Sequence, residues 1–329
     1  MGLGVALVAY VIVVVAESVP ALDTAPSGCP PLPSFPDSSC TGWRHTGVTL
    51  KPSGDLTITV PGTVVDSKDV AGHICVQASH VTIKRTRVRG TISTASGNEA
   101  TGCPGSYVHN VLIEDVEIVG PWKSGIDYTA DELGEMATTV GVAGDGYTCR
   151  RCQVHLWGRG FQVNRDVTIE DSYVYDLIGT SRGGRWVGND GSSHNSCIGG
   201  NGAIDAVYRH NNLDCAIVND QGGVSGAIVL YSRSEFLPAK NVLIKDNLLN
   251  GGAYCIYPGV PADPASDPVP TDIRVLGNYF GRALYPKCGS YGPAAGWTYG
   301  HGNQWRDNVW ADTGELIEIK AIVSRGSQN

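Results

Sequence analysis

The sequence lacks the basic segments expected of a nucleic-acid-binding protein. It has 24 Lys and Arg residues against 32 Asp and Glu, and no run of Lys or Arg is longer than two residues. Because phosphate binding needs a basic face, we expect no nucleic-acid partner. An anionic sugar is still compatible with this composition, because a cleft can be locally basic on an acidic molecule.

Methionine is nearly absent, with 2 residues in a chain of 329, whereas glycine and proline are abundant, with 43 and 18 residues. This composition is typical of many tight turns and few long helices. Helical periodicity is also missing between the apolar segments, which argues against a solenoid of helices.

A pattern of eight residues, shown by Val242 to Leu249 (VLIKDNLL), recurs along most of the chain. It opens with the alternation of a short half-buried strand, bends at an Asp- and Asn-rich middle, and closes on an apolar residue. Further copies begin at Val81, Val111, Tyr147, Val167, Ala206, Ile273 and Asn303, at spacings of 20 to 39 residues. Repeats of this length bury their faces only against their neighbours. The sequence therefore predicts one all-β solenoid of about eight or more coils.

Asparagine occupies the sixth position of the last four copies, as Asn211, Asn247, Asn278 and Asn308. Its side chain tolerates a left-handed turn and hydrogen-bonds backbone groups, which suits a corner that recurs in every coil. We expect stacking of the coils to align these residues in an asparagine ladder.

The ten cysteines are an even number and are spread along the chain. They are Cys29, Cys40, Cys75, Cys103, Cys149, Cys152, Cys197, Cys215, Cys255 and Cys288. Only Cys149 and Cys152 form a close pair, so no zinc site is expected. Disulfides are the expected state, and the sequence alone leaves their connectivity open. Pairing of nearest neighbours would clip each loop to its own or the adjacent coil.

The N-terminus contains an uncharged run of 15 residues, Gly2 to Ala16, that resembles the apolar region of a secretory signal peptide. No Lys or Arg precedes it, and a buried strand or helix is the alternative. We expect a signal peptide in 1–21, an extended lead-in in 22–47, the repeat domain in 48–323 and a disordered tail in 324–329. Glu315 to Val323 is expected to form a final strand. The mature protein is expected to be secreted, monomeric and not inserted in a membrane.

Two intervals between copies, Pro121 to Gly146 and Ile178 to Gly202, are longer than the repeat requires. Long loops on a rigid scaffold often carry function. The second interval combines cations, an aromatic ring and an imidazole, as a site for an acidic sugar requires. The residues concerned are Arg182, Arg185, Trp186, His194 and Asn195. A Gly-rich connector is the alternative interpretation.

The octets and their asparagine column resemble the right-handed parallel β-helix of the pectate lyase-like superfamily. More closely, the chain from about Cys29 to Trp310 resembles secreted actinobacterial proteins described as right-handed parallel β-helix repeat proteins. The likeness rests on Gly62 to Asp66, Val167 to Tyr175, His194 with Arg209-His210-Asn211, Glu235 to Pro238, and Cys288 to Gly292 ahead of Gly302 to Trp305. The superfamily includes lyases, hydrolases, epimerases and phage spikes, so the resemblance implies the fold more narrowly than the activity.

A polysaccharide lyase needs three groups: a base for the proton next to a uronate carboxylate, a cation that neutralises the carboxylate, and an acid for the leaving oxygen. We expect His194 or Tyr231 as the base, Arg209 as the cation and Tyr231 as the acid. The further substrate-binding candidates are Asp127, His155 and Glu235. For each of these residues, a role in ordering a loop, strand or turn is the alternative.

Two other functional classes stay open. A glycoside hydrolase of the polygalacturonase type needs carboxylates on neighbouring coils, but the sequence has no Asp-Asp pair and no Asn-Thr-Asp. A non-catalytic glycan-binding or structural β-helix would use exposed tryptophans, for which Trp122, Trp157, Trp186 and Trp297 are candidates. Calcium is the candidate cofactor because it prefers oxygen ligands, although the sequence has no Asp-rich loop with fixed ligand spacing.

Overall fold

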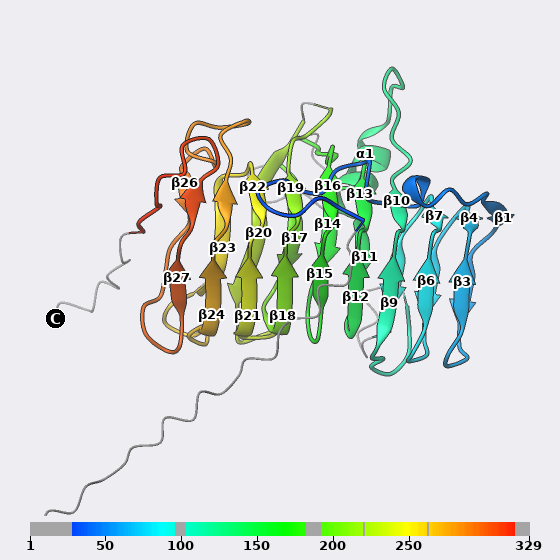
Figure 1. The fold of residues 1–329 in the computed structure, drawn as a ribbon, viewed down its shortest axis with the longest axis horizontal. Helices are drawn as coiled ribbons and strands as arrows, with labels where there is room; N and C mark the ends of the chain where they lie inside the picture. Colours follow the sequence, from blue (N-terminus) through cyan, green and yellow to red (C-terminus); the bar gives the residue numbers. More distant parts are fainter. Residues whose placement is uncertain (1–27, 96–102, 182–191, 220, 262, 320–329) are drawn as a thin grey trace, which may run out of the picture.

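The computed structural model describes residues 28–95, 103–181, 192–219, 221–261 and 263–319. In these residues the chain coils through three parallel sheets, as the sequence predicts, and the protein is a parallel β-helix (Figure 1). The described helices are the short 3-10 helix η1 (Arg44–Thr46) and α1 (Ala130–Thr138). The predicted signal peptide and the predicted disordered tail lie outside the described residues.

Each full coil contributes one strand to each of the three sheets. Sheet C contains β3 (Val64–Asp66), β6 (Thr82–Lys84), β9 (Val111–Glu114), β12 (Tyr147–Arg150), β15 (Thr168–Glu170), β18 (Ala203–Arg209), β21 (Ala239–Lys245), β24 (Thr271–Leu276) and β27 (Gln304–Arg306). Sheet A contains β1 (Lys51–Ser53), β4 (Lys68–Val70), β7 (Arg87–Val88), β10 (Glu117–Val119), β13 (Gln153–His155), β16 (Tyr173–Tyr175), β19 (Asn212–Asp214), β22 (Leu248–Asn250), β25 (Tyr279–Phe280) and β28 (Val309–Trp310). Sheet B contains β2 (Leu56–Ile58), β5 (Ile74–Val76), β8 (Ile92–Thr94), β11 (Val140–Ala143), β14 (Arg159–Gln162), β17 (His194–Gly200), β20 (Gly223–Ser232), β23 (Tyr254–Pro261) and β26 (Gly292–Ala294).

The sequence octet corresponds to a strand of sheet C, a corner and a strand of sheet A. In the copy that begins at Val242, β21 ends at Lys245 and β22 begins at Leu248. The left-handed residue of the corner is Asp246, with φ of 58°, so the sequence placed the left-handed turn one position too late. Asn247 follows it, fully buried, and its side chain bonds to the neighbouring coils.

The predicted asparagine ladder is present. The Nδ2 group of Asn211 donates to Oδ1 of Asn247, Asn247 donates to Asn278, and Asn278 donates to Asn308, each at 2.9 Å. The same Oδ1 atoms also accept the backbone N–H of the preceding asparagine, at 3.0 Å. At this corner the asparagine side chains thus form hydrogen bonds with buried backbone N–H and C=O groups that have no partner in the strand ladders.

The core is one continuous stack along the solenoid axis. The third octet position, as in Ile83, Ile113 and Ile244, and the eighth position, as in Val88 and Leu249, point inward and are fully buried. Each apolar side chain therefore packs on its equivalents in the coils above and below, and the stack buries apolar surface that a single coil would leave exposed to water.

The structure contains five disulfides, one within the lead-in segment and four within the coils, and they have the nearest-neighbour pairing. They join Cys29 with Cys40, Cys75 with Cys103, Cys149 with Cys152, Cys197 with Cys215, and Cys255 with Cys288. Nearest-neighbour pairing follows from the fold, because residues of one coil or of adjacent coils are the ones a parallel β-helix brings together.

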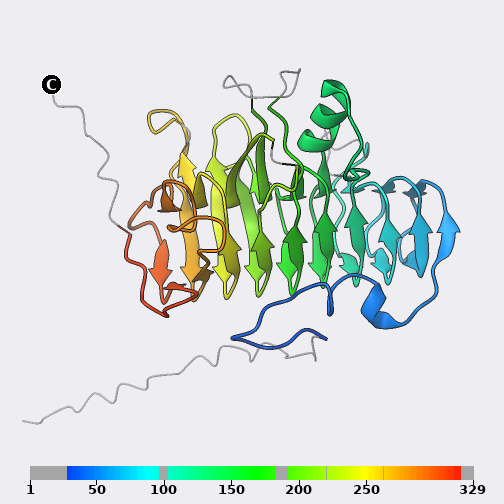
Figure 2. The same cartoon turned by 90° about the horizontal axis from the view of Figure 1, so that it is seen from above.

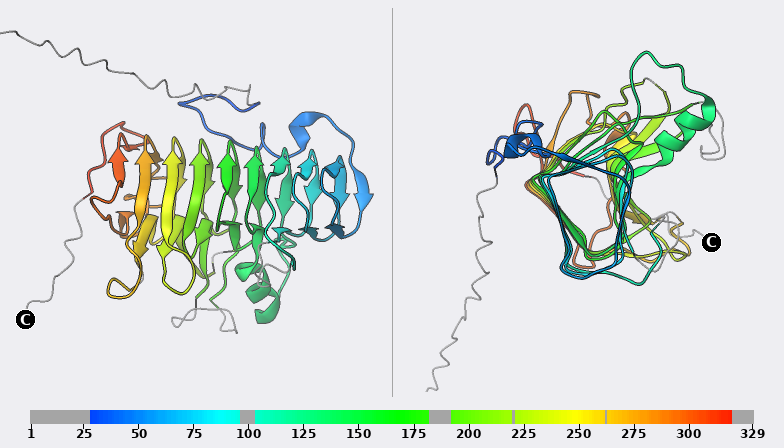
Figure 3. Two further views of the ribbon diagram at one scale, coloured as in Figure 1. Left: turned by 90° about the horizontal axis from the view of Figure 1, so that it is seen from below. Right: turned by 90° about the vertical axis from the view of Figure 1, so that its right-hand side faces the viewer.

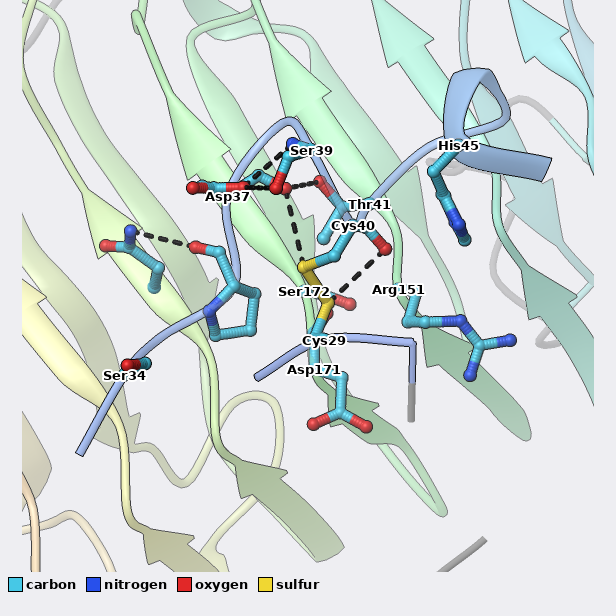
Figure 4. Close-up of a disulfide and its surroundings, with 12 residues drawn as sticks. Cys29, Ser34, Asp37, Ser39, Cys40, Thr41, His45, Arg151, Asp171 and Ser172 are labelled. Atoms are coloured by element: carbon cyan, nitrogen blue, oxygen red, sulfur yellow. Dashed lines mark hydrogen bonds between the residues drawn. A yellow bond between two sulfur atoms is a disulfide. The ribbon is translucent and has the colours of Figure 1, made fainter. Parts of the chain in front are cut away.

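The lead-in from residue 28 to residue 47, here called the N-terminal strap, lies alongside the coils in the middle of the solenoid (Figure 2). The Cys29–Cys40 disulfide closes it into a loop over Asp171 and Ser172 (Figure 4). The indole of Trp43 donates to the Glu117 carboxylate at 2.8 Å, and the Arg44 guanidinium pairs with the same carboxylate at 2.7 Å. The strap is thus held on sheet A by an indole hydrogen bond and an ion pair to the same glutamate.

His210 joins the strap to the solenoid. Its Nδ1 atom lies 2.6 Å from Oδ1 of Asp171, and its Nε2 atom lies 3.1 Å from the carbonyl of Ser34. Burial lowers the pKa of His210, but the hydrogen bonds to Asp171 and Ser34 outweigh burial and raise the pKa above 6.5. Only the protonated imidazole donates to both oxygens.

We expect the strap to be held more tightly in mild acid than in alkali. Because the pKa of His210 is higher in the folded protein than the unfolded value of 6.5, protonation of His210 favours the folded form. This contribution to stability is complete below pH 6.5 and is lost as the pH rises through the folded-state pKa. Amide protection factors around Phe35 should therefore be higher below pH 6.5 than above the folded-state pKa. In His210→Gln this difference should shrink, and an equal pH dependence in both proteins would contradict the assignment.

The C-terminal end is closed differently from the expected strand. Within the described residues, only an isolated antiparallel bridge joins Val309 to Leu316. The indole of Trp305 instead donates to the carbonyl of Ile317 at 2.8 Å, and Ile317 is buried. Backbone N–H groups of Trp310 and Ile317 also donate to the carbonyls of Glu315 and Asn308, so the segment covers the last coil through both backbone and side-chain hydrogen bonds. Neither helix of the described residues has the length and apolar character needed to cross a membrane.

Candidate functional site: a polar pocket on sheet B

Sheet B is flanked by the loops that vary most in length. Viewed along the solenoid axis, α1 projects from the corner between sheets A and B, and other loops project beyond the next corner (Figure 3). The sequence analysis did not predict α1, although its N-terminus has a capping box. Thr129 accepts from the N–H of Glu132, whose carboxylate in turn accepts the N–H of Thr129. This reciprocal pattern is a local sequence signal for a helix start.

A cavity of about 260 Å³ lies on the outer face of sheet B, over β14, β17 and β20. It is lined by Arg159, Gln162, His194, Ser196, Gly199, Gly200, Asn201, Ser225, Val229, Tyr231 and Arg233. Two residues expected to be catalytic, His194 and Tyr231, are among them. A larger hollow of about 590 Å³ lies at the C-terminal end beside Trp297 and Trp305, but no predicted catalytic residue lines it.

Strand alternation brings the polar side chains to this face. On β20, Ile228 and Leu230 are fully buried in the core, whereas Val229 and Tyr231 line the pocket. Arg233 follows Tyr231 by two residues and lines it as well. Period-two alternation could have placed Arg233 beside Tyr231 from the sequence.

The pocket holds two guanidinium groups without carboxylate partners. Among the described residues, no carboxylate lies within salt-bridge distance of Arg159 or Arg233. Arg159 donates to the carbonyl of His194 at 3.5 Å, and burial lowers the pKa of its guanidinium below the ordinary value of arginine. The Nε–H of Arg233 is buried without a hydrogen-bond partner. Unpaired cations in a pocket are suited to bind an anionic ligand.

Tyr231 lies under one of these cations. The guanidinium of Arg233 is 5.2 Å from the centre of the Tyr231 ring. Burial raises the pKa of the Tyr231 phenol, and the charge of Arg233 partly opposes that shift. The phenol therefore keeps its proton near neutral pH, as a proton donor must.

The structure does not bring Arg209 into the pocket. Arg209 ends β18 in sheet C, and its guanidinium lies 2.6 Å from Oε2 of Glu170. Glu170 also pairs with Arg150 on the next coil at 2.6 Å. The fourth octet position thus alternates in charge along sheet C from Lys84 to Arg209, and Arg209 pairs with Glu170 there.

His155 also lies on another sheet. It ends β13 of sheet A, where its Nε2 atom is 3.2 Å from Oε1 of Glu117. Its ring stacks on that of Tyr175, with centroids 4.8 Å apart. Both contacts lie beside the N-terminal strap, which binds the same Glu117.

The other substrate-binding candidates do not line the pocket or lie outside the described residues. Asn195 is buried and donates to the carbonyl of Ile178 at 2.5 Å, so it holds the loop that precedes β17. Asp127 is exposed ahead of α1, and Glu235 is exposed in the loop after β20. Arg182, Arg185 and Trp186 lie outside the described residues.

The tryptophans proposed for a sugar-binding face are largely core residues. Trp157 and Trp297 are buried, and Trp122 is partly buried against the core. Trp186 lies outside the described residues. Apart from the buried Phe161, the aromatic residues on the strands of sheet B are tyrosines, and of these only Tyr231 was singled out from the sequence.

No group of three or more His, Cys, Asp or Glu side chains in the described ranges could hold a metal ion. Protein-family models, curated proteins and solved structures gave no match to this chain. The structure itself defines the class: a disulfide-stapled parallel β-helix with a cationic pocket on one sheet.

Proposed function

We propose that this protein is a secreted polysaccharide lyase that cleaves a uronic-acid-containing glycan by β-elimination in the pocket on sheet B. One observation supports this best: the pocket gathers two unpaired guanidinium groups, an imidazole and a phenol, and its described lining residues include no carboxylate. These are the side chains that elimination next to a carboxylate needs.

Arg159 takes the role that the sequence analysis gave to Arg209. Its guanidinium neutralises the uronate carboxylate, which makes the adjacent C5 proton more acidic. His194 removes that proton, and the electron pair forms the double bond between C4 and C5. The bond from C4 to the glycosidic oxygen breaks at the same time. Tyr231 donates its proton to the leaving oxygen, since its raised pKa keeps the phenol protonated.

An inverting glycoside hydrolase is less well supported at this place. Its chemistry needs two carboxyl groups, one to protonate the leaving oxygen and one to activate water. The strands of sheet B contain no Asp or Glu. Secretion is supported by the five disulfides, which form and persist in oxidising compartments.

Incubation of the protein with a panel of uronic-acid polysaccharides, with and without calcium, tests this function. We expect the ultraviolet absorbance of an unsaturated uronate to rise, and His194→Ala to abolish the rise while the protein stays folded. If the unmodified protein binds a glycan but does not cleave it, the protein is a non-catalytic binding module. New reducing ends without the absorbance would indicate a hydrolase. Either outcome would reject the lyase.

A further inference from the structure

A continuous aromatic surface extends from the pocket toward the C-terminal end of sheet B. It consists of Tyr231, Tyr257, Tyr254 and Tyr291, here called the tyrosine patch. The successive ring centroids are 5.5, 5.8 and 5.6 Å apart. Tyr231 belongs to both the pocket and the patch, so the two surfaces are continuous.

The patch is held open to solvent rather than folded into the core. The rings of Tyr254 and Tyr257 are half-buried, and Tyr291 is 70% exposed. The backbone N–H of Tyr291 donates to the carbonyl of Ala253 at 2.8 Å, which fixes Tyr291 to the neighbouring coil. An exposed aromatic surface held by the backbone of two coils is available for a ligand.

Charge on sheet B is confined to the pocket. Among its strands, only β14 and β17 contain a side chain that can be cationic, Arg159 and His194, and Arg233 directly follows β20. Strands β23 and β26, which contain or adjoin the tyrosine patch, have the sequences YCIYPGVP and GPA and contain no charged residue. The outer face of sheet B is therefore cationic at the pocket, whereas its strands at the tyrosine patch are uncharged and carry aromatic rings.

We infer that the glycan recognised here is a mixed polysaccharide, in which a uronate residue is followed by neutral sugars that lie on the tyrosine patch. This inference rests on the proposed function and specifies its substrate class. The apolar C–H face of a neutral pyranose packs on an aromatic ring, and its hydroxyl groups stay in water.

A homopolymer of uronates fits this surface poorly. It would place further carboxylates against the tyrosine rings, whose faces carry negative partial charge. The strands beneath the patch offer no cation to compensate them, so these carboxylates would lose water without gaining a partner. The tyrosine patch thus selects against a second uronate next to the first.

Binding of two oligosaccharides of equal length tests the inference, one with a single uronate followed by neutral hexoses and one made only of uronates. Affinities are measured by titration calorimetry in a His194→Ala background, which keeps the glycans intact. We expect the mixed oligosaccharide to bind more tightly. Tyr257→Ala should weaken it about tenfold, as expected for loss of one aromatic stacking contact.

Two control variants separate stacking from other effects. Tyr257→Phe keeps the ring and should retain the affinity, and Tyr107→Ala removes a tyrosine that is 39% exposed outside sheet B and should change nothing. Tighter binding of the homopolymer, or no effect of Tyr257→Ala, would overturn the inference while leaving the lyase proposal intact. Absence of binding to both oligosaccharides would reject the uronate site itself and the inference with it.

Discussion

Replacing Asn247 by alanine is expected to lower the free energy of unfolding by roughly 3–5 kcal/mol, because several buried polar groups lose their partners at once. The Oδ1 atom of Asn247 accepts from the backbone and side-chain amides of Asn211. Its Nδ2 group donates to the carbonyl of Tyr208 and to Oδ1 of Asn278. The site is fully buried, so water does not replace these bonds.

Chemical denaturation, followed by circular dichroism, measures this loss. Asn308→Ala is the matched control, because Asn308 ends the ladder: it accepts from Asn278 and donates to the carbonyl of Val275, but among the described residues it donates to no further asparagine. We expect it to cost clearly less than Asn247→Ala. Equal losses at the two positions would show that the ladder is not a cooperative element of the fold.

The second large effect is expected for Arg159→Ala. Removing a cation that is aimed at the developing charge of a transition state typically reduces kcat by about 10²–10³-fold. Among the described residues, no carboxylate lies within salt-bridge distance of Arg159, whose guanidinium lines the pocket. Initial rates of uronate elimination, measured on the polysaccharide that the unmodified protein cleaves, give the size of the loss.

Arg89→Ala is the matched control for this substitution. Arg89 is 52% exposed, pairs with Asp69 beside sheet A and lies away from the pocket. It should leave the elimination rate unchanged. Arg209→Ala separates the two possible neutralising cations, since Arg209 already pairs with Glu170. A loss of activity in Arg209→Ala that exceeds the loss in Arg159→Ala, with folding retained, would return the role to Arg209.

Much of the fold was readable because the octet is a local pattern. Strand, corner and strand follow one another within eight residues, and their apolar positions alternate as the pleat requires. The octets therefore predicted sheets C and A, the stacked core and the asparagine ladder. The left-handed position was missed by one residue because residues as different as Asp, His, Gly and Arg occupy it, as Asp246 and Arg151 show.

Sheet B had no such pattern. Its strands fall in the intervals between octets, and they contain glycine and polar residues such as those of β17, HNSCIGG. Such a segment pairs because a strand of the adjacent coil lies beside it, and its own sequence gives little preference for a strand. The interval from Ile178 to Gly202, which contains β17, was therefore interpreted as a loop.

The site was predicted only in part for a related reason. His194 and Tyr231 were singled out by residue type, and the structure brings them together with Arg159 and Arg233. Arg209 was favoured because its octet position points outward. The side chain does point outward, but from sheet C rather than from sheet B.

The sequence by itself determined that this chain coils as a parallel β-helix, where the corner between sheets C and A lies to within one residue, and which residues of these two sheets fill the core, because those features repeat at short range. Only the tertiary structure decided which outward face carries the site. A solenoid has three outward faces, and the coil geometry that assigns each polar residue to one of them depends on the length of every loop between the octets.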